Sequence, residues 1–295
     1  MSDIGFKLED IGFYGFENTK EIHRLAVEGE KLWNLLFEKN LDFGGWLVEI
    51  TGLMGRGKTS LMLEMINKNL TEFPDELLFW REPPLVPLQI AKLNDNFEIF
   101  SERKYPLKIC ELGKTRPLPV DKYKVRYFRG YTELLKMVRP GQVNVVYFRE
   151  PYRWIELLFR LRFSTEFQSV YIDELEDVCP NRCKDKQFWE NERFANHLKE
   201  IRKARVNVIY NTQSPTDIDW RIRSKIMMHI YMQGSRGDHE SPVYKQMIQS
   251  LDVGEAIIDL GFALFGKIRF RAYRPKEKLY AVFPTDNRGR ISYKV

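Results

Sequence analysis

A glycine-rich segment restricts what this chain can fold into. Its residues are Gly52, Leu53, Met54, Gly55, Arg56, Gly57, Lys58 and Thr59, followed by Ser60. A short apolar run, 46–50, precedes the segment, and apolar residues at helical spacing follow it over 60–70. The predicted order is therefore strand, loop and helix. Glycines let a loop turn its N–H groups inward, and a helix N-terminus attracts anions, so the segment predicts a phosphate-binding loop.

The complete pattern of glycine, four residues, glycine, lysine and threonine is specific for nucleoside triphosphates, and we expect ATP with Mg²⁺. The backbone of residues 52–60 would surround the phosphates. Lys58 would contact the β and γ phosphates, and the Thr59 hydroxyl would bind the metal ion. The sequence contains no Asn-Lys-x-Asp stretch of the kind that binds guanine, which disfavours GTP.

Two acids follow a second apolar run. Residues 170–172 are β-branched or aromatic, and Asp173 and Glu174 come directly after them. Phosphoryl transfer needs a carboxylate that holds the metal ion and a group that orients the attacking water. We predict that Asp173 binds Mg²⁺ through water and that Glu174 is the general base. The alternative for both residues is an acid pair that caps a helix.

A third predicted strand, 206–210, also has a polar end. Thr212 and Gln213 lie between this strand and Pro215. Because ligands of open α/β sheets bind at the carboxyl ends of the strands, Gln213 is predicted to contact the γ phosphate or its water. The alternative is that these polar residues only begin a loop.

The order of the predicted elements defines an α/β fold, with a parallel sheet flanked by helices. Further apolar strand and helix patterns occur between and after the motifs, and one β-α-β unit is predicted. The predicted strands are 46–50, 143–148, 170–172 and 206–210, and the predicted helices are 60–70, 154–161 and 188–204.

Three regions depart from this alternation. Residues 1–45 form a predicted N-terminal helical segment, with an amphipathic helix around 21–37. Residues 73–129 contain seven prolines and many basic and aromatic residues, and they predict an insertion that divides the core into 46–72 and 130–295. Short strands predicted at 256–258, 267–272 and 279–283 form a C-terminal β-containing extension.

Composition narrows the cellular setting. No apolar run approaches the roughly 18 to 20 residues that a membrane span requires. Three cysteines, an odd number, do not form a disulfide framework. We therefore expect a cytoplasmic protein without a membrane span, in the host cytoplasm if it is viral. The net charge of +6, from 47 basic and 41 acidic residues, permits a polyanionic partner without requiring one.

In their order along the chain, the phosphate loop, the Asp173-Glu174 pair and the Thr212-Gln213 pair resemble the HerA/FtsK superfamily of P-loop motor ATPases. The resemblance covers residues 46–231. Its most specific stretch, 201–213, resembles the arginine, apolar strand and Thr-Gln series of that family. Residues 213–219, followed by Ile222 and Arg223, are also similar to the zonula-occludens-toxin and filamentous-phage assembly branch. The resemblance implies a RecA-like P-loop NTPase core, a homo-hexamer or other ring, and ATP-driven movement of DNA.

The same resemblance implies that an arginine from a neighbouring subunit stabilises charge on the transferred phosphate. Arg202 lies at the matching distance before Gln213, and Arg205 is the second choice. Arg221 and Arg223 are weaker candidates. The alternative for each arginine is a solvated side chain or one that contacts a nucleic-acid backbone.

The leading functional hypothesis is a ring-forming ATPase that moves or packages DNA, with double-stranded DNA as the expected partner, as in viral or plasmid genome packaging, extrusion or transfer. The basic and aromatic residues predicted to contact the polyanion are Arg103, Lys104, Tyr105, Lys122, Tyr123, Lys124, Arg126, Tyr127 and Arg129. A solvated surface is the other explanation of this composition. The alternative function is a nucleotide-switched ATPase that drives protein or virion assembly or secretion, with viral or secretion-complex proteins as partners.

Overall fold

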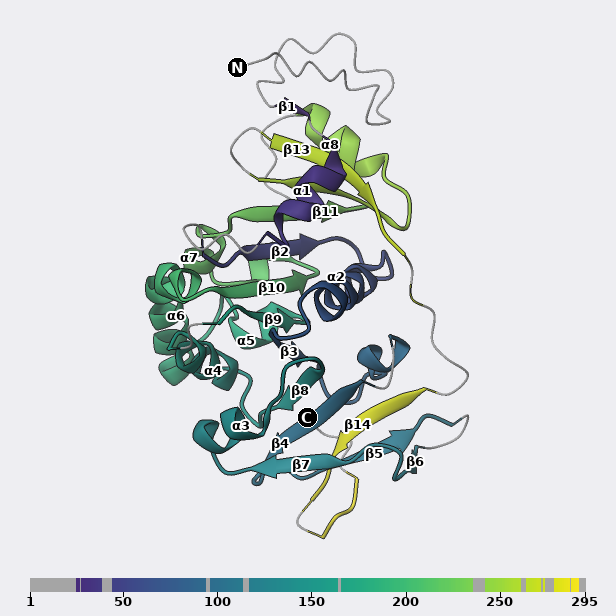
Figure 1. Cartoon of the computed structure of the whole chain (residues 1–295), viewed down its shortest axis with the longest axis vertical. Coiled ribbons are helices and arrows are strands. Elements are labelled where there is room, and N and C mark those ends of the chain that lie inside the picture. The colour runs from purple at the N-terminus through teal and green to yellow at the C-terminus, as the bar shows by residue number, and fades with distance from the viewer. Residues whose placement is uncertain are drawn as a thin grey trace.

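The computed structural model describes residues 25–26, 28–38, 44–93, 96–113, 117–163, 166–235, 242–260, 264–271, 273, 279–286 and 288–291. Within these residues, eleven strands form one sheet (Figure 1). Their order across the sheet is β1 (Leu25–Ala26), β13 (Leu264–Arg269), β12 (Glu255–Asp259), β11 (Met228–Met232), β2 (Leu47–Thr51), β10 (Val206–Thr212), β9 (Gln168–Ile172), β3 (Leu77–Arg81), β8 (Val143–Tyr147), β4 (Phe97–Glu102) and β7 (Val125–Phe128).

The strand directions bring many carboxyl ends to one edge of the sheet. All neighbours from β11 to β7 pair in parallel. By contrast, β12 pairs antiparallel with both β11 and β13. The edge formed by the carboxyl ends of the parallel strands is where open α/β sheets bind their ligands.

Helices cover both faces of the sheet (Figure 1). One face, called the α2 face below, packs against α1 (Gly29–Leu35) and α2 (Lys58–Glu72). The opposite face packs against α3 (Tyr131–Met137), α4 (Arg153–Leu161), α5 (Leu175–Val178), α6 (Asp185–Lys203) and α7 (Trp220–Arg223). Strand β3 shows the alternation, because Leu78 and Trp80 are buried on the α2 face and Phe79 on the other.

The predicted α/β fold with a parallel sheet flanked by helices is confirmed. The strands predicted at 46–50, 143–148, 170–172 and 206–210 correspond to β2, β8, β9 and β10, and the three predicted helices to α2, α4 and α6. The predicted β-α-β unit differs in one respect. Strands β8 and β9 are not neighbours, because β3 lies between them.

The segment predicted as an insertion, 73–129, departs from that expectation. It supplies β3, β4 and β7 to the main sheet. Its prolines lie outside these three strands, so a high proline content did not exclude core strands. The strands β5 (Leu107–Glu111) and β6 (Leu118–Pro119) instead join β14 (Tyr280–Pro284) in a small antiparallel sheet. Apolar residues of β5 and β14 pack on the α2 face.

The two ends of the chain complete the description. The strands predicted near the C-terminus occur as β12 and β13 in the main sheet and β14 in the small one. Helix α1 lies within the helix predicted around 21–37, but that prediction is wrong for Leu25–Ala26, which form strand β1 by pairing with β13. Residues 21–24, like most of 1–45, lie outside the described ranges. The remaining short elements are η2 (Gln89–Lys92), η3 (Pro215–Asp217) and α8 (Pro242–Gln249). None of the described helices combines the length and apolar character needed to cross a bilayer.

Candidate functional site

The predicted phosphate loop lies between β2 and α2, at the carboxyl edge of the sheet. Gly55 and Gly57 have φ angles of 77° and 99°, a left-handed region that favours glycine. Helix α2 begins at Lys58, directly after Gly57. The helix therefore directs its N-terminus, with its unpaired N–H groups, at the loop, as anion binding requires.

Neighbouring strands shape the loop from the side. A Cβ atom on Gly52 would lie 2.9 Å from Cβ of Met232, at the end of β11, and one on Gly57 would lie 3.2 Å from the Phe270 ring, just after β13. The Leu53 N–H also donates to the Gln233 carbonyl at 3.3 Å. Packing therefore favours glycine at both positions, and Gly57 is also required by its backbone conformation.

Lys58 is buried beneath the loop that it would serve. Its Nζ donates to the carbonyl oxygens of Gly52 at 2.8 Å and Leu53 at 3.3 Å. Burial lowers the pKa of Lys58, and the nearby carboxylates of Asp173, Glu176 and Glu174 oppose this shift. The ammonium group is therefore already oriented at the loop and lies in an acidic environment.

Asp173 follows β9 at the same edge and is buried. Its carboxylate accepts a hydrogen bond from the Asn211 side chain, and its carbonyl accepts one from Arg81. Burial raises the pKa of Asp173 to about 6, and the Asn211 hydrogen bond opposes the rise. A second hydrogen bond of Asn211 reaches Sδ of Met62 in α2 at 3.2 Å, so Asp173 and Asn211 lie on the α2 face.

Glu174 has a backbone conformation that is rare outside glycine, with φ at 59°. Its N–H donates to Oδ1 of Asn211 at 3.0 Å, and its carbonyl accepts from Arg81 at 3.1 Å. The half-buried side chain accepts a hydrogen bond from Nε2 of Gln213 at 3.3 Å. Strain of this kind is concentrated at functional sites, and here two neighbouring strands hold it in place.

The structure therefore brings together the residues of the three sequence motifs. Lys58, Asp173, Glu174 and Gln213 come from the ends of different elements and meet at one edge. Thr59 and Ser60 lie in the first turn of α2, half-buried. Within the described residues no group of three or more His, Cys, Asp or Glu side chains forms a metal cage. A metal ion at this edge would take ligands from Thr59, Asp173 and a bound phosphate.

Sequence reasoning missed two residues that hold the site. Asn211 contacts both Asp173 and Glu174, and Arg81 binds both of their carbonyls as well as Oδ2 of Asp177 at 2.7 Å. The signal for Asn211 is its position directly after the apolar run Val208 to Tyr210 and directly before Thr212 and Gln213. Arg81 was harder to predict, because Pro83 and Pro84 follow it closely and made a strand at this position unexpected.

The predicted arginines do not join this site within one chain. Arg202 lies in the last turn of α6, and Arg205 precedes β10 with φ at 61°. Both therefore lie at the amino end of β10, whereas Gln213 follows its carboxyl end. The weaker candidate Arg221 is held by Asp219, with Nη2 at 2.7 Å from Oδ2. Arg202 and Arg205 could act only on the site of another subunit.

The basic and aromatic residues predicted to contact a polyanion divide into two places. Four of them line an open groove of about 410 Å³ on β4 and β7, together with Phe97, Glu98 and Ile99: Lys122, Tyr123, Lys124 and Arg126. Arg126 pairs with Glu98 at 2.9 Å, and Lys122 lies over the ring of Tyr123 at 4.7 Å. We call this feature the β4/β7 groove.

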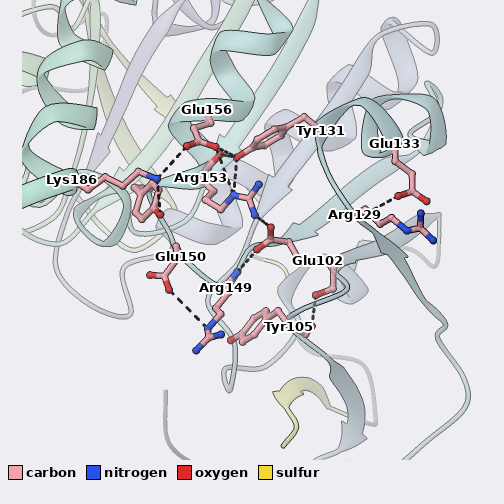
Figure 2. Close-up of polar contacts among 12 residues, drawn as sticks. Glu102, Tyr105, Arg129, Tyr131, Glu133, Arg149, Glu150, Arg153, Glu156 and Lys186 are labelled. Atoms are coloured by element: carbon pink, nitrogen blue, oxygen red, sulfur yellow. Dashed lines mark hydrogen bonds and ion pairs between the residues drawn. The ribbon is translucent and has the colours of Figure 1, made fainter. Parts of the chain in front are cut away.

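Two of the others, Tyr105 and Arg129, lie beside a polar cluster at the carboxyl ends of β4, β7 and β8 (Figure 2). At its centre the buried Glu102 pairs with Arg153, and its Oε2 accepts the Arg149 N–H at 3.1 Å. Tyr131 donates to Glu156 at 2.6 Å. The cluster fixes α3 and α4 to the strand ends and leaves the Arg149 side chain 66% exposed.

The fold and the site together define a P-loop protein with a RecA-like core. Among solved structures, the genome packaging NTPase B204 of Sulfolobus turreted icosahedral virus 2 is similar in its complexes with ATP-gammaS and AMPPCP. The TM-score is 0.51 for both, with 12% and 13% identity, over 78% and 77% of this chain and 98% of the viral protein in each case. A bacterial conjugative coupling protein, TrwB, has a TM-score of 0.49 at 12% identity, over 84% of this chain and 93% of TrwB.

The similarity to the viral NTPase confirms the resemblance to HerA/FtsK-type P-loop ATPases at the level of the fold. No family model matches the chain, and no curated protein matches it.

Proposed function

We propose that this chain is a Mg²⁺-dependent ATPase that works in a ring of identical subunits and moves or packages DNA. The observation that carries the proposal is the contact between Gln213 and Glu174, 3.3 Å apart, beside the buried Asp173 and the phosphate loop. This contact links the ends of β9 and β10 to one another at the nucleotide edge. Through this contact, a bound phosphate at the loop can affect the ends of both strands.

Each residue has a distinct task in the proposed reaction. Lys58 turns from the loop carbonyls to the β and γ phosphates, because the loop amides and its own charge favour an anion there. Glu174 accepts a proton from the attacking water as that water bonds to the γ phosphorus and ADP leaves. Gln213 holds the Glu174 carboxylate in position. Thr59 and Asp173 would hold Mg²⁺, whose charge would offset that of the phosphates.

The proposal also includes the substrate of the ring and its cellular compartment. The fold is that of a viral genome packaging NTPase, which supports DNA as the substrate, and the β4/β7 groove offers cations and an aromatic ring to a phosphate backbone. The three cysteines Cys110, Cys179 and Cys183 are free thiols, which supports work in the reducing cytoplasm.

Steady-state ATP hydrolysis tests this function. The rate is measured without DNA, with double-stranded DNA and with single-stranded DNA, each at two salt concentrations. We expect strong stimulation by double-stranded DNA that declines as salt rises, because phosphate contacts release counterions. A low rate that DNA does not change would contradict the DNA motor and favour a nucleotide switch that acts on a protein partner.

The β4/β7 groove is tested in the same assay. Replacing Lys122 and Lys124 together with glutamine is expected to weaken DNA stimulation and to reduce its salt dependence by about one counterion per lost contact. The DNA-free rate should not change. The matched control replaces two exposed lysines elsewhere, Lys136 and Lys199, with glutamine. Equal stimulation in both double variants would remove the groove from the DNA path.

Arg202 is proposed to act on the nucleotide of the neighbouring subunit. Arg202→Ala should lower turnover by roughly 1,000-fold, the low end of what such arginines contribute, without weakening nucleotide binding. Mixing it with Lys58→Ala subunits should restore part of the activity, because mixed interfaces combine an intact loop with an intact arginine. The same mixture prepared with Arg205→Ala tests the second candidate. Mixing without any recovery would leave both arginines as structural residues.

A further inference from the structure

Phe270 is a half-buried aromatic residue beside the phosphate loop, and the proposed mechanism does not use it. It directly follows β13 and packs against the core on the α2 face. Its N–H donates to the Gly254 carbonyl at 2.9 Å, and Gly254 has φ at 93°, in the region that favours glycine. A backbone contact with the turn before β12 therefore fixes the position of Phe270.

The phosphate loop meets the edge of the Phe270 ring. A Cβ atom on Gly57 would lie 3.2 Å from Cε2 and 3.3 Å from Cζ of this ring. These two atoms belong to the rim of the ring that is farthest from its own backbone. Gly57 directly precedes Lys58 and Thr59, the first residues of α2. The ring thus stands beside the helix N-terminus that is predicted to hold the phosphates, and its contact with the loop does not use a ring face.

The order of the strands gives a bound nucleotide a direction. Asp173, Glu174 and Gln213 follow β9 and β10, on one side of β2. Phe270 follows β13, which lies on the other side of β2, beyond β11 and β12. The γ phosphate belongs near the first three residues, because the proposed mechanism places the metal ion and the attacking water there. The α phosphate, with the ribose and the base, therefore points away from them, toward Phe270.

The chain after Phe270 follows the first turns of α2. The Tyr273 hydroxyl donates to Glu64 in this helix at 2.7 Å. Glu64 lies four residues after Ser60, on the same face of the helix. Val253, in the turn before β12, is a large apolar residue that is 57% exposed. An aromatic ring and an exposed apolar side chain thus border the place where the base would lie.

We propose that the Phe270 ring stacks on the base of the bound nucleotide and is the base subsite of this protein. The inference rests on the proposed ATPase function, because the triphosphate in the loop positions the base. Every base has a π face, so an aromatic ring binds bases with little dependence on their hydrogen-bonding groups. The ligand is therefore a nucleoside triphosphate that binds more tightly than its triphosphate group alone.

Isothermal titration in the presence of Mg²⁺ tests the proposal with two ligands, AMPPCP and inorganic tripolyphosphate, which has no base. Phe270→Leu is expected to weaken AMPPCP binding by about 5-fold or more, the low end of what stacking contributes. Binding of tripolyphosphate should stay unchanged, because leucine keeps an apolar side chain beside Gly57. If a thermal melt shows that this variant does not fold, Phe270→Met, which is unbranched and also lacks a ring, should show the same selective loss.

The matched control is Phe73→Leu. Phe73 lies at the opposite end of α2 and is also half-buried against the same core, so its replacement should leave both affinities unchanged. Unchanged AMPPCP binding by Phe270→Leu, or an equal loss for both ligands, would overturn the inference, as would wild-type protein that binds tripolyphosphate as tightly as AMPPCP. The ATPase proposal would survive these results. Wild-type protein that binds neither ligand would overturn that proposal itself.

Discussion

Replacing Glu174 with glutamine is expected to lower ATP turnover by about 100- to 10,000-fold, the range that a general base contributes, while nucleotide affinity remains. The reason is that glutamine cannot accept the proton of the attacking water. Glutamine keeps an oxygen that accepts the Gln213 amide hydrogen bond, and the backbone of residue 174 remains held by Asn211 and Arg81. The Glu174→Gln variant should therefore keep its nucleotide affinity while it loses ATP turnover.

The measurement pairs steady-state hydrolysis with equilibrium binding of a fluorescent ATP analogue. Glu176→Gln is the matched control, because it makes the same substitution two residues further along the chain. Its Oε1 accepts the Gln213 N–H at 3.2 Å, which glutamine can still do, so a far smaller loss is expected. Normal hydrolysis by Glu174→Gln would show that another group activates the water.

Replacing Lys58 with alanine is expected to reduce both nucleotide affinity and turnover. Hydrogen bonds to charged groups contribute about 1.5–3 kcal/mol each, which corresponds to at least about 10-fold in affinity. Turnover should fall further, because the same ammonium group faces the charge that develops on the transferred phosphate. Among the contacts described, Lys58 bonds only to the carbonyls of Gly52 and Leu53, so the loss should concern function more than folding.

Isothermal titration with AMPPCP and Mg²⁺ measures the affinity, and a thermal melt checks the fold. The control is Arg56→Ala, which removes a cation from the same loop. Arg56 is half-buried and precedes the helix, so a smaller loss is expected. Unaltered binding by Lys58→Ala would mean that the phosphates are held by backbone amides alone.

The parts of the site that follow from local sequence are those in which one short segment carries the chemistry. The segment from Gly52 to Thr59 predicted a phosphate loop between a strand and a helix, because its glycines, Lys58 and Thr59 each have a known task in such a loop. Asp173 and Glu174 were predicted from their position directly after an apolar run, and Gln213 from its position between such a run and Pro215. The structure brings these side chains to one edge of the sheet, and their catalytic roles stay predictions.

The other residues of the site could not be predicted, because their roles depend on which strands are neighbours in the sheet. The local sequence pattern does not contain that information. Strand β3 was overlooked because prolines flank it, although Leu77 to Trp80 is a strongly apolar run. Without β3 between β8 and β9, the contacts of Arg81 with the Asp173 segment cannot be foreseen. Asn211 acquires its role only from the register of β10 with β9. Long-range pairing thus decided which polar residues support the motifs.

The contacts of the phosphate loop with Met232, Gln233 and Phe270 bear on how far this protein can be shortened. A chain cut after Gln213 would keep Lys58, Asp173, Glu174 and Gln213. It would nevertheless lose the side chains that press on Gly52 and Gly57 and the carbonyl that binds the Leu53 amide. The conformation of the loop therefore depends on residues that lie some 200 positions after it, roughly two thirds of the chain length. Any minimal, transplantable version of this nucleotide site has to extend through Phe270.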